Sequence, residues 1–257
     1  MSEKNRDGKR TARERLAVER EKQKTADKRR RTLIVGASVV CVLGLAAVIG
    51  VIAANAGKEK GSSAGPVVAP SGAQGKDSLA IPVGKDGAKS TLTVWEDFRC
   101  PACMGFEIRY RPTLHELEDA GKLRIEYHLV RLIDGNLGGS GSLRAANAAA
   151  CAQDAGKFRD YHDVLYGNQP QETDDAFADN DKLIRLAGKV KGLDTPAFRK
   201  CVKDGAHDSW VNKSHKAMQA ARFSSTPTVL LDGKNIYQDQ TLTPAKLKQM
   251  VEQAHQG

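Results

Sequence analysis

Two cysteines three positions apart are the residues in this sequence best suited to chemistry. Cys100 and Cys103 are separated by Pro101 and Ala102, and they lie between a strand-like apolar run and a helix-like run. Two thiols at this spacing can close a small reversible disulfide, and a helix N-terminus beneath them favours the thiolate that exchanges disulfides. The same spacing is half of a zinc site, so the pair alone indicates either redox exchange or metal binding.

The histidines that follow the cysteine pair do not complete a zinc site. His115 and His128 come next, with twelve residues between them, whereas a zinc finger places its two histidines a few residues apart. We therefore expect no metal and no cofactor. The remaining histidines lie on expected helices without a matching set of acids or cysteines, and we assign no chemistry to His162, His207, His215 and His255.

The local patterns place the cysteine pair between a strand and a helix. Residues 91–95 alternate around Leu92 and Val94, as in a strand. Residues 101–120 have helical composition, with Cys100 at the N-cap and a proline at the first helical position. Pro112 lies inside this helix and is expected to kink or interrupt it.

A second strand is expected at residues 123–132, and the pattern then changes to helices before strands return. The expected helices span residues 142–155, 158–166, 174–190, 196–203, 208–221 and 243–255, and the expected strands of a final hairpin span residues 228–231 and 236–237. The order strand, helix, strand, helical block, hairpin, helix predicts an α/β sheet with a helical insertion at about residues 138–222.

An uncharged stretch of 22 residues, 33–54, precedes this domain. As a helix it would be roughly 33 Å long, which matches a hydrocarbon core of about 30 Å. We therefore expect a single transmembrane helix that anchors the chain in membrane lipid. A cleaved signal peptide is the alternative, although its apolar region would be shorter and residues 53–56 make only a passable cleavage site.

The positive charge of the chain is concentrated before the apolar stretch. Residues 1–32 contain 13 Lys or Arg and 6 Asp or Glu, so they carry +7 of the total +9. The positive-inside rule predicts that this basic tail is cytoplasmic and that the domain lies outside the cytoplasm, on a single-pass protein of the cell membrane. The other 225 residues carry only +2, which argues against a nucleic-acid-binding domain.

A flexible linker is expected at residues 55–78, between the membrane helix and a folded domain at residues 79–257. Most of this segment is rich in Gly, Ser, Ala and Pro and has no periodic apolar face. Such a linker would hold the domain near the membrane while allowing it to reach other surfaces.

Four cysteines follow the apolar stretch, and Cys41 lies within it. If Cys100 and Cys103 pair with each other, Cys151 either pairs with Cys201 or both remain free thiols. An oxidising location outside the cytoplasm favours the bridge. That bridge would close a loop of about 50 residues and stabilise the fold by about 4 kcal/mol in the chain-entropy model.

Three segments resemble the thioredoxin superfamily and, more closely, its DsbA-like branch. They are residues 97–103 (DFRCPAC), 145–161 (AANAAACAQDAGKFRDY) and 225–229 (STPTV), within a resemblance that covers roughly residues 79–253. The resemblance implies a thioredoxin fold interrupted by a helical domain. It also implies a protein thiol:disulfide oxidoreductase whose redox pair is Cys100 and Cys103.

The resemblance assigns a supporting role to the segment at Thr226 and Pro227. Pro227 would be the cis proline that packs beside the cysteine pair, and Thr226 would offer backbone groups to a substrate strand. A cis bond before proline turns the chain sharply and leaves an extended edge that can pair with another peptide. Ala102 stands where DsbA-like oxidases often carry a thiolate-stabilising histidine, so we expect a weaker oxidant than the strongest members.

Glu96 is the candidate for a buried acid beside the cysteines. Many relatives carry such an acid six residues before the first cysteine, where this chain has Val94. Glu96 lies two residues later and would point to the same face of the strand. It is interpreted either as the proton acceptor for Cys103 or as a solvated carboxylate at the strand end, and the sequence leaves both open.

The resemblance implies an enzyme that introduces disulfides into exported proteins with cysteines. A substrate thiolate would attack Cys100 while Cys103 leaves, and a quinone-linked membrane oxidase would reoxidise the pair. A reductase or isomerase, in which the Cys100 thiolate attacks a substrate disulfide, is one alternative. A thioredoxin-fold module that binds or chaperones other chains is another. The sequence does not fix the direction of electron flow.

Overall fold

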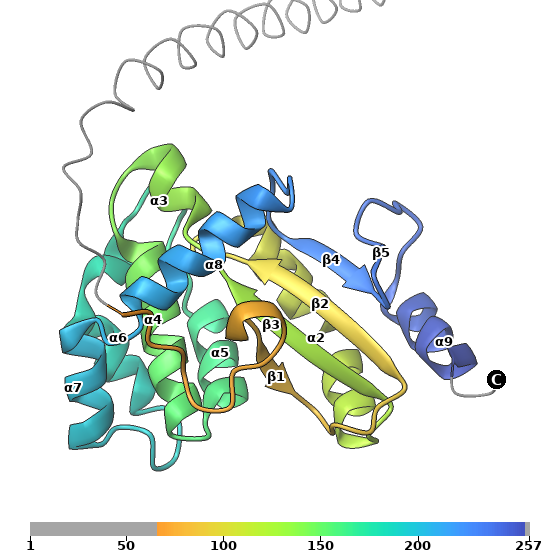
Figure 1. Cartoon of the computed structure of the whole chain (residues 1–257), viewed down its shortest axis with the longest axis horizontal. Coiled ribbons are helices and arrows are strands. Elements are labelled where there is room, and N and C mark those ends of the chain that lie inside the picture. The colour runs from red at the N-terminus through yellow and green to blue at the C-terminus, as the bar shows by residue number, and fades with distance from the viewer. Residues whose placement is uncertain (1–65, 255–257) are drawn as a thin grey trace, which may run out of the picture. The chain divides into compact units, whose positions relative to one another are not determined.

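The computed structural model describes residues 66–254 (Figure 1). The predicted basic tail, the predicted transmembrane helix and the first part of the predicted linker lie outside the described residues. Within residues 66–254, no helix is both long and apolar enough to cross a membrane. The expectations for residues 1–65 therefore stay predictions.

A mixed sheet with the strand order β1-β3-β2-β4-β5 forms the centre of the domain. The strands are β1 (Ile81–Val83), β2 (Ser90–Glu96), β3 (Leu123–Leu129), β4 (Thr228–Leu231) and β5 (Lys234–Asn235). β2 and β3 are parallel, and the other neighbouring pairs are antiparallel. Parallel strands need a crossover connection, and the helix that follows the cysteine pair supplies it.

Helices cover both faces of the sheet because its strands bury side chains on each side (Figure 1). α2 (Pro101–Asp119) contacts β3 and also α9 (Pro244–Ala254), whereas α8 (Asp208–Ala220) packs on β3 from the other side. Leu92 and Val94 belong to the main core, and Trp95 belongs to a smaller cluster with Met218 of α8. The alternation of β2 therefore places side chains in two cores, and the cysteine pair belongs to the main one.

The helical insertion connects β3 to α8. Its elements are α3 (Leu132–Leu137), α4 (Gly141–Asp154), α5 (Phe158–Gly167), η2 (Ala176–Ala178), α6 (Asn180–Ala187) and α7 (Pro196–Asp204). α4 is the central helix and carries fully buried alanines, whose small side chains let neighbouring helices approach from several sides. The insertion shares one continuous core with the sheet and α2. The expected thioredoxin fold with a helical insertion is confirmed.

Several helices and strands begin or end at residues other than those that the sequence predicts. The second strand ends at Leu129, and α3, which the sequence did not predict, follows it. The helix expected at residues 174–190 is divided, because the side chain of Asp179 accepts a hydrogen bond from the Asp181 N–H and caps a new helix. Of the kink or interruption expected at Pro112, the interruption is wrong, since α2 continues through this residue. Pro112 lies on the exposed side of α2, where water can hydrate the carbonyl left without a donor.

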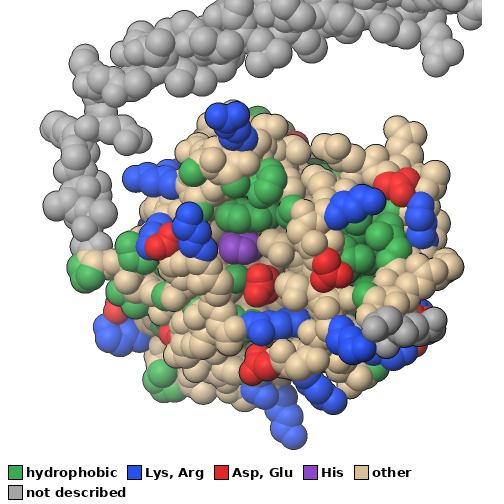
Figure 2. All heavy atoms as spheres, turned by 45° about the vertical axis from the view of Figure 1, so that its right-hand side comes forward, with side chains coloured by type: hydrophobic (Ala, Val, Ile, Leu, Met, Phe, Trp, Pro, Cys, Tyr) green, Lys and Arg blue, Asp and Glu red, His purple; other side chains and the backbone are tan. Residues whose placement is uncertain are grey.

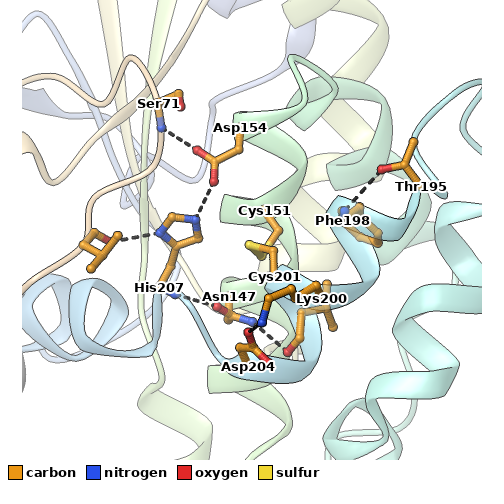
Figure 3. The surroundings of a disulfide bond; sticks show 12 residues. Ser71, Asn147, Cys151, Asp154, Thr195, Phe198, Lys200, Cys201, Asp204 and His207 are labelled. Atoms are coloured by element: carbon orange, nitrogen blue, oxygen red, sulfur yellow. Dashed lines mark hydrogen bonds and ion pairs between the residues drawn. A yellow bond between two sulfur atoms is a disulfide. The ribbon is translucent and has the colours of Figure 1, made fainter.

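Residues 66–78, which the sequence assigns to the linker, instead lie along α4 and α8. The Val68 carbonyl lies 2.9 Å from His207 Nδ1, and the Ser71 N–H donates to Asp154 at 2.7 Å (Figure 3). The Trp210 indole N–H donates to the Ser78 carbonyl at 2.7 Å. The folded domain therefore begins before residue 79. We call residues 66–78 the strap, which lies against α4 and α8 and precedes β1.

A disulfide joins two helices of the insertion. Cys151 on α4 and Cys201 on α7 are bonded, whereas Cys100 and Cys103 are free thiols. Figure 3 shows the bond beside His207, whose Nε2 lies 2.9 Å from a carboxylate oxygen of Asp154. The bond therefore ties α4, the central helix of the insertion, to α7, which comes just before His207 and its contact with Val68.

Loss of this disulfide is expected to destabilise the domain without changing its fold. In a chain that carries Cys100→Ala and Cys103→Ala, adding Cys151→Ala and Cys201→Ala should lower the free energy of unfolding by about 2–4 kcal/mol, because the unfolded chain is no longer constrained. Urea unfolding followed by circular dichroism measures the difference between the two chains. An unchanged midpoint would show that the bridge does not contribute to stability.

Candidate active site

Cys100 and Cys103 lie at the beginning of α2 in different environments. Cys100 is the N-cap residue in an extended conformation, and Pro101 occupies the first helical position. Pro101 and Ala102 are exposed, whereas Cys100 is 6% exposed and Cys103 is 0% exposed. One thiol therefore lies at the edge of the protein and its partner lies wholly inside.

The peptide bond between Thr226 and Pro227 is cis, as the resemblance implied. This segment leads into β4, which pairs antiparallel with β2, so the topology brings it beside the start of α2. The thiol of Cys100 donates a hydrogen bond to the Thr226 carbonyl oxygen at 3.3 Å. Two motifs that are 126 positions apart thus form one site.

The environment of Cys100 favours its thiolate. A hydrogen bond from Cys103 is the largest cause that lowers the pKa of Cys100, which falls to about 6. Burial opposes this shift, and the polar Thr226 side chain and the backbone N–H groups of Ala102 and Cys103 add to it. Cys100 is therefore a nucleophile at neutral pH.

The environment of Cys103 favours its protonated thiol. Burial is the largest cause that raises the pKa of Cys103, and the neighbouring Cys100 and the charge of Glu96 raise it further. A thiol without contact to water stays protonated when the adjacent sulfur carries a negative charge. The two cysteines of the pair are therefore differentiated before any substrate binds.

Glu96 is buried at the end of β2 and is not solvated. Its Oε1 lies 2.8 Å from Nε2 of His162 on α5, and both side chains are buried. The interpretation of Glu96 as a solvated strand-end carboxylate is therefore wrong. His162, to which the sequence assigned no chemistry, is buried and pairs with this acid.

Arg99 anchors the loop that carries Cys100. Its buried guanidinium forms ion pairs with Asp134 at 2.8 Å and Asp175 at 2.9 Å, and it also donates to the Gly138 carbonyl at 2.9 Å. These partners belong to the insertion, so the insertion holds the active-site loop. The role of Arg99 was not predicted, although this residue lies directly before Cys100 in the segment that carries the resemblance.

Two further polar side chains fix the same loop. The side-chain amide of Gln169 donates to the carbonyl oxygens of Phe98 at 2.8 Å and Cys100 at 3.1 Å. Asp97 accepts the backbone N–H groups of Arg99 and Ile133. Burial raises the pKa of Asp97 to about 7, although both hydrogen bonds lower it. No sequence pattern pointed to Gln169, because its position depends on the turn after α5.

Two groups in residues 66–254 have the residue types of metal ligands. In the first, the sulfurs of Cys151 and Cys201 are bonded to each other and are not thiolate ligands. In the second, the ligand atoms of Glu96, Glu107 and His162 lie within 4.8 Å of one another. The nitrogen of His162 that faces this group is already paired with Glu96, so charge compensation within the protein accounts for the arrangement.

The family model described as thioredoxin matches residues 77–253, and the chain belongs to this family. A probable disulfide bond formation protein D of Bacillus cereus is 27% identical over 154 residues, covering 59% of this chain and 69% of the relative. The reduced DsbA of Mycobacterium tuberculosis is 28% identical with a TM-score of 0.60, covering 70% of this chain and 93% of that one.

BdbD of Bacillus subtilis, at 22% identity and a TM-score of 0.59, covers 75% of this chain and 100% of that one and supports the fold alone. Together with the relatives above, the cysteine pair and the cis proline define the chain as a DsbA-like protein thiol:disulfide oxidoreductase.

Removing the Thr226 hydroxyl is expected to raise the pKa of Cys100. Thr226→Val keeps the size of the side chain but removes the hydroxyl, which is buried without a hydrogen-bond partner in residues 66–254 and lowers the pKa of Cys100. The loss of one polar interaction with a thiolate corresponds to about one pKa unit. Thr226→Ser is the matched control and should leave the pKa near that of the unaltered chain. The ultraviolet absorbance of the thiolate, followed through pH, gives both values. Equal pKa values of Cys100 in the Val and Ser variants would show that the Thr226 hydroxyl does not lower this pKa.

Proposed function

We propose that this chain is a membrane-tethered enzyme that introduces disulfides into exported proteins. The observation that carries the proposal is the position of the Cys100 thiol, at the N-terminus of α2 and against the Thr226 carbonyl that precedes the cis bond to Pro227. This position lowers the pKa of Cys100. A stable thiolate is a good leaving group and favours the reduced form of the enzyme. An enzyme that gains stability on reduction takes electrons from its substrates, which become oxidised.

The proposed cycle transfers two electrons from a substrate dithiol to the enzyme disulfide. A substrate thiolate attacks Cys100 Sγ, the bond to Cys103 breaks, and Cys103 leaves as a thiolate that takes up a proton. The second substrate thiolate then attacks the substrate sulfur of the mixed disulfide. A substrate disulfide forms, and Cys100 leaves as the thiolate that its surroundings stabilise.

An extended segment of an unfolded protein is the substrate that fits this site. The chain around Thr226 lies beside Cys100, where its backbone can pair with a peptide strand. Figure 2 shows hydrophobic side chains gathered in patches on one face of the domain, with acidic and basic side chains between them. Ile108 of α2 and Tyr237 after β5 are among the exposed large hydrophobic residues of the described part. Such a surface suits chains of varied sequence.

The proposal also includes a membrane span that tethers the domain and a membrane oxidase that reoxidises the cysteine pair. The uncharged stretch at residues 33–54 and the basic residues before it support a single membrane span with the catalytic domain outside the cytoplasm. A cycle that reduces the pair requires an oxidant, and a quinone-linked oxidase in the same membrane would accept the two electrons. The relative of Bacillus cereus is named for disulfide bond formation, which agrees with this direction.

The reduction potential of the pair tests the direction of electron flow. The oxidase proposal predicts a potential well above that of thioredoxin, which is about −270 mV, and below the strongest oxidants at about −120 mV, because Ala102 replaces a thiolate-stabilising histidine. Equilibration of residues 66–257 with glutathione buffers gives the value. A potential near that of thioredoxin would favour a reductase instead.

Thiol labelling in intact cells tests the orientation. After mild reduction, a membrane-impermeant maleimide should label the full chain, whereas a chain with Cys100→Ala and Cys103→Ala should show much weaker labelling. Cys41 lies inside the predicted span and should be protected in both. Labelling that appears only after the membrane is opened would place the domain in the cytoplasm and contradict the proposal.

A further inference from the structure

A cavity of about 490 Å³ lies on the face of the sheet that α8 partly covers, opposite to α2 (Figure 1). Its walls come from the end of the strap and the residue that follows it, from β2 and β3, and from α8. Sites for small molecules in proteins have volumes of about 300–1,000 Å³. The cavity is therefore large enough for a ligand, and disulfide exchange at the cysteine pair does not use it.

Two stacked rings form the base of this cavity. Trp95 of β2 and His128 of β3 are direct partners in the parallel strand pair, and their ring centroids lie 3.9 Å apart with an angle of 10° between the planes. Both residues are less than a tenth exposed. Burial lowers the pKa of His128 to about 4, although the Leu79 backbone opposes this shift, so the imidazole is neutral at pH 7. The base of the cavity is therefore aromatic and uncharged.

The last two turns of α8 provide one wall with short side chains. Ala217, Ala220 and Ala221 line the cavity together with Lys213, and their spacing of three, four or eight positions places them on one side of the helix. Leu79, which is buried, adds an apolar contact from the end of the strap. Because each alanine carries only a methyl group, space remains between α8 and the two rings.

The charged residues that line the cavity are mostly basic. Three lysines, Lys76, Lys213 and Lys216, and one acid, Asp77, belong to its lining, which gives a net charge of +2. Lys213 Nζ lies 3.5 Å from Asp77 Oδ1, so one ion pair joins α8 to the strap. Lys76 and Lys216 are exposed to solvent. An apolar cavity with a positive rim is complementary to a ligand that has an apolar body and an acidic group.

The strap is held in a fixed conformation where it borders the cavity. Asp77 and Ser78 have φ angles of 60° and 55°, in the left-handed region that side chains other than glycine rarely adopt. The Trp210 indole N–H donates to the Ser78 carbonyl at 2.7 Å, and Gln74 and Ala80 exchange two backbone hydrogen bonds at 2.8 and 3.0 Å. These contacts maintain an unfavourable backbone conformation, so this wall of the cavity is formed before a ligand binds.

We propose that this cavity binds a small aromatic anion, that is, a flat ring system that carries one carboxylate, sulfonate or phosphate group. Its ring would contact Trp95 and the alanines of α8, and aromatic pairs gain more than their buried area alone provides. Ammonium groups attract both an acidic group and the face of an aromatic ring, which favours an aromatic body over an alkyl chain. The cavity and the cysteine pair lie on opposite faces of the sheet, so this inference does not depend on the proposed disulfide exchange.

Titration with naphthalene-1-sulfonate, followed by NMR, tests the site directly. Residues 66–257 contain the whole continuous core and serve as the ¹⁵N-labelled protein at pH 7. The chain has two tryptophans, and Trp95→Phe identifies the indole N–H signal of Trp95. This signal should shift and saturate with a Kd of about 1 mM or lower. The signal of Trp210, which does not line the cavity, should shift less.

Variants of the lining separate this site from general binding to the surface. Lys213→Gln with Lys216→Gln should weaken binding roughly tenfold, because two exposed ion pairs together contribute a factor of that size. Lys191→Gln with Lys200→Gln removes the same charge from residues outside the lining and should leave the Kd unchanged. Ala220→Leu, on the exposed end of α8, should fill the cavity and abolish the saturable shift, while circular dichroism confirms that the chain is folded.

Several results would overturn the proposal. An unmoved Trp95 signal, or equal weakening by the two pairs of lysine variants, would exclude this binding site. Equal affinity for naphthalene-1-methanol, the neutral analogue, would exclude an anion as its ligand, and tighter binding of decanoate would exclude an aromatic body. Alkylation of Cys100 with iodoacetamide should leave the Kd unchanged, and loss of binding would place the probe at the cysteine pair instead. None of these results bears on the proposed exchange of disulfides.

Discussion

The structure depends on the different environments of the two cysteines at the beginning of α2. Cys100 must hold a negative charge at the protein edge, while Cys103, one turn later, must remain in an environment without water. The helix N-terminus and the Thr226 side chain meet the first requirement, and the core formed by β2, α2 and α5 meets the second. Each sulfur therefore has a separate role before a substrate arrives.

The helical insertion is part of this arrangement and not an appended domain. It shares the main core with the sheet, and it supplies the partners of Arg99, the amide of Gln169 and the imidazole of His162. These contacts fix the backbone of the active-site loop and place a cation beside Glu96. Buried ion pairs contribute little net stability when compared with apolar packing, so their value here is the position and charge that they give to the cysteine pair.

Much of the fold followed from the sequence because its signals are local. The cysteine spacing, the proline at the first helical position and the alternation of β2 specified the centre of the site. Asp179 and the second half of the expected linker were misread, since a cap inside a helical pattern and a strap that packs on distant helices depend on tertiary contacts. His162 was missed for the same reason: its partner lies 66 positions away, on another element.

An NMR titration of the reduced domain, with isotopically labelled cysteine Cβ atoms, tests the central claim most directly, because it reports each thiol separately. The account predicts that Cys100 titrates near pH 6 and that Cys103 remains protonated well above the ordinary thiol pKa of about 8.5. Titration of both thiols together near that ordinary value would contradict it.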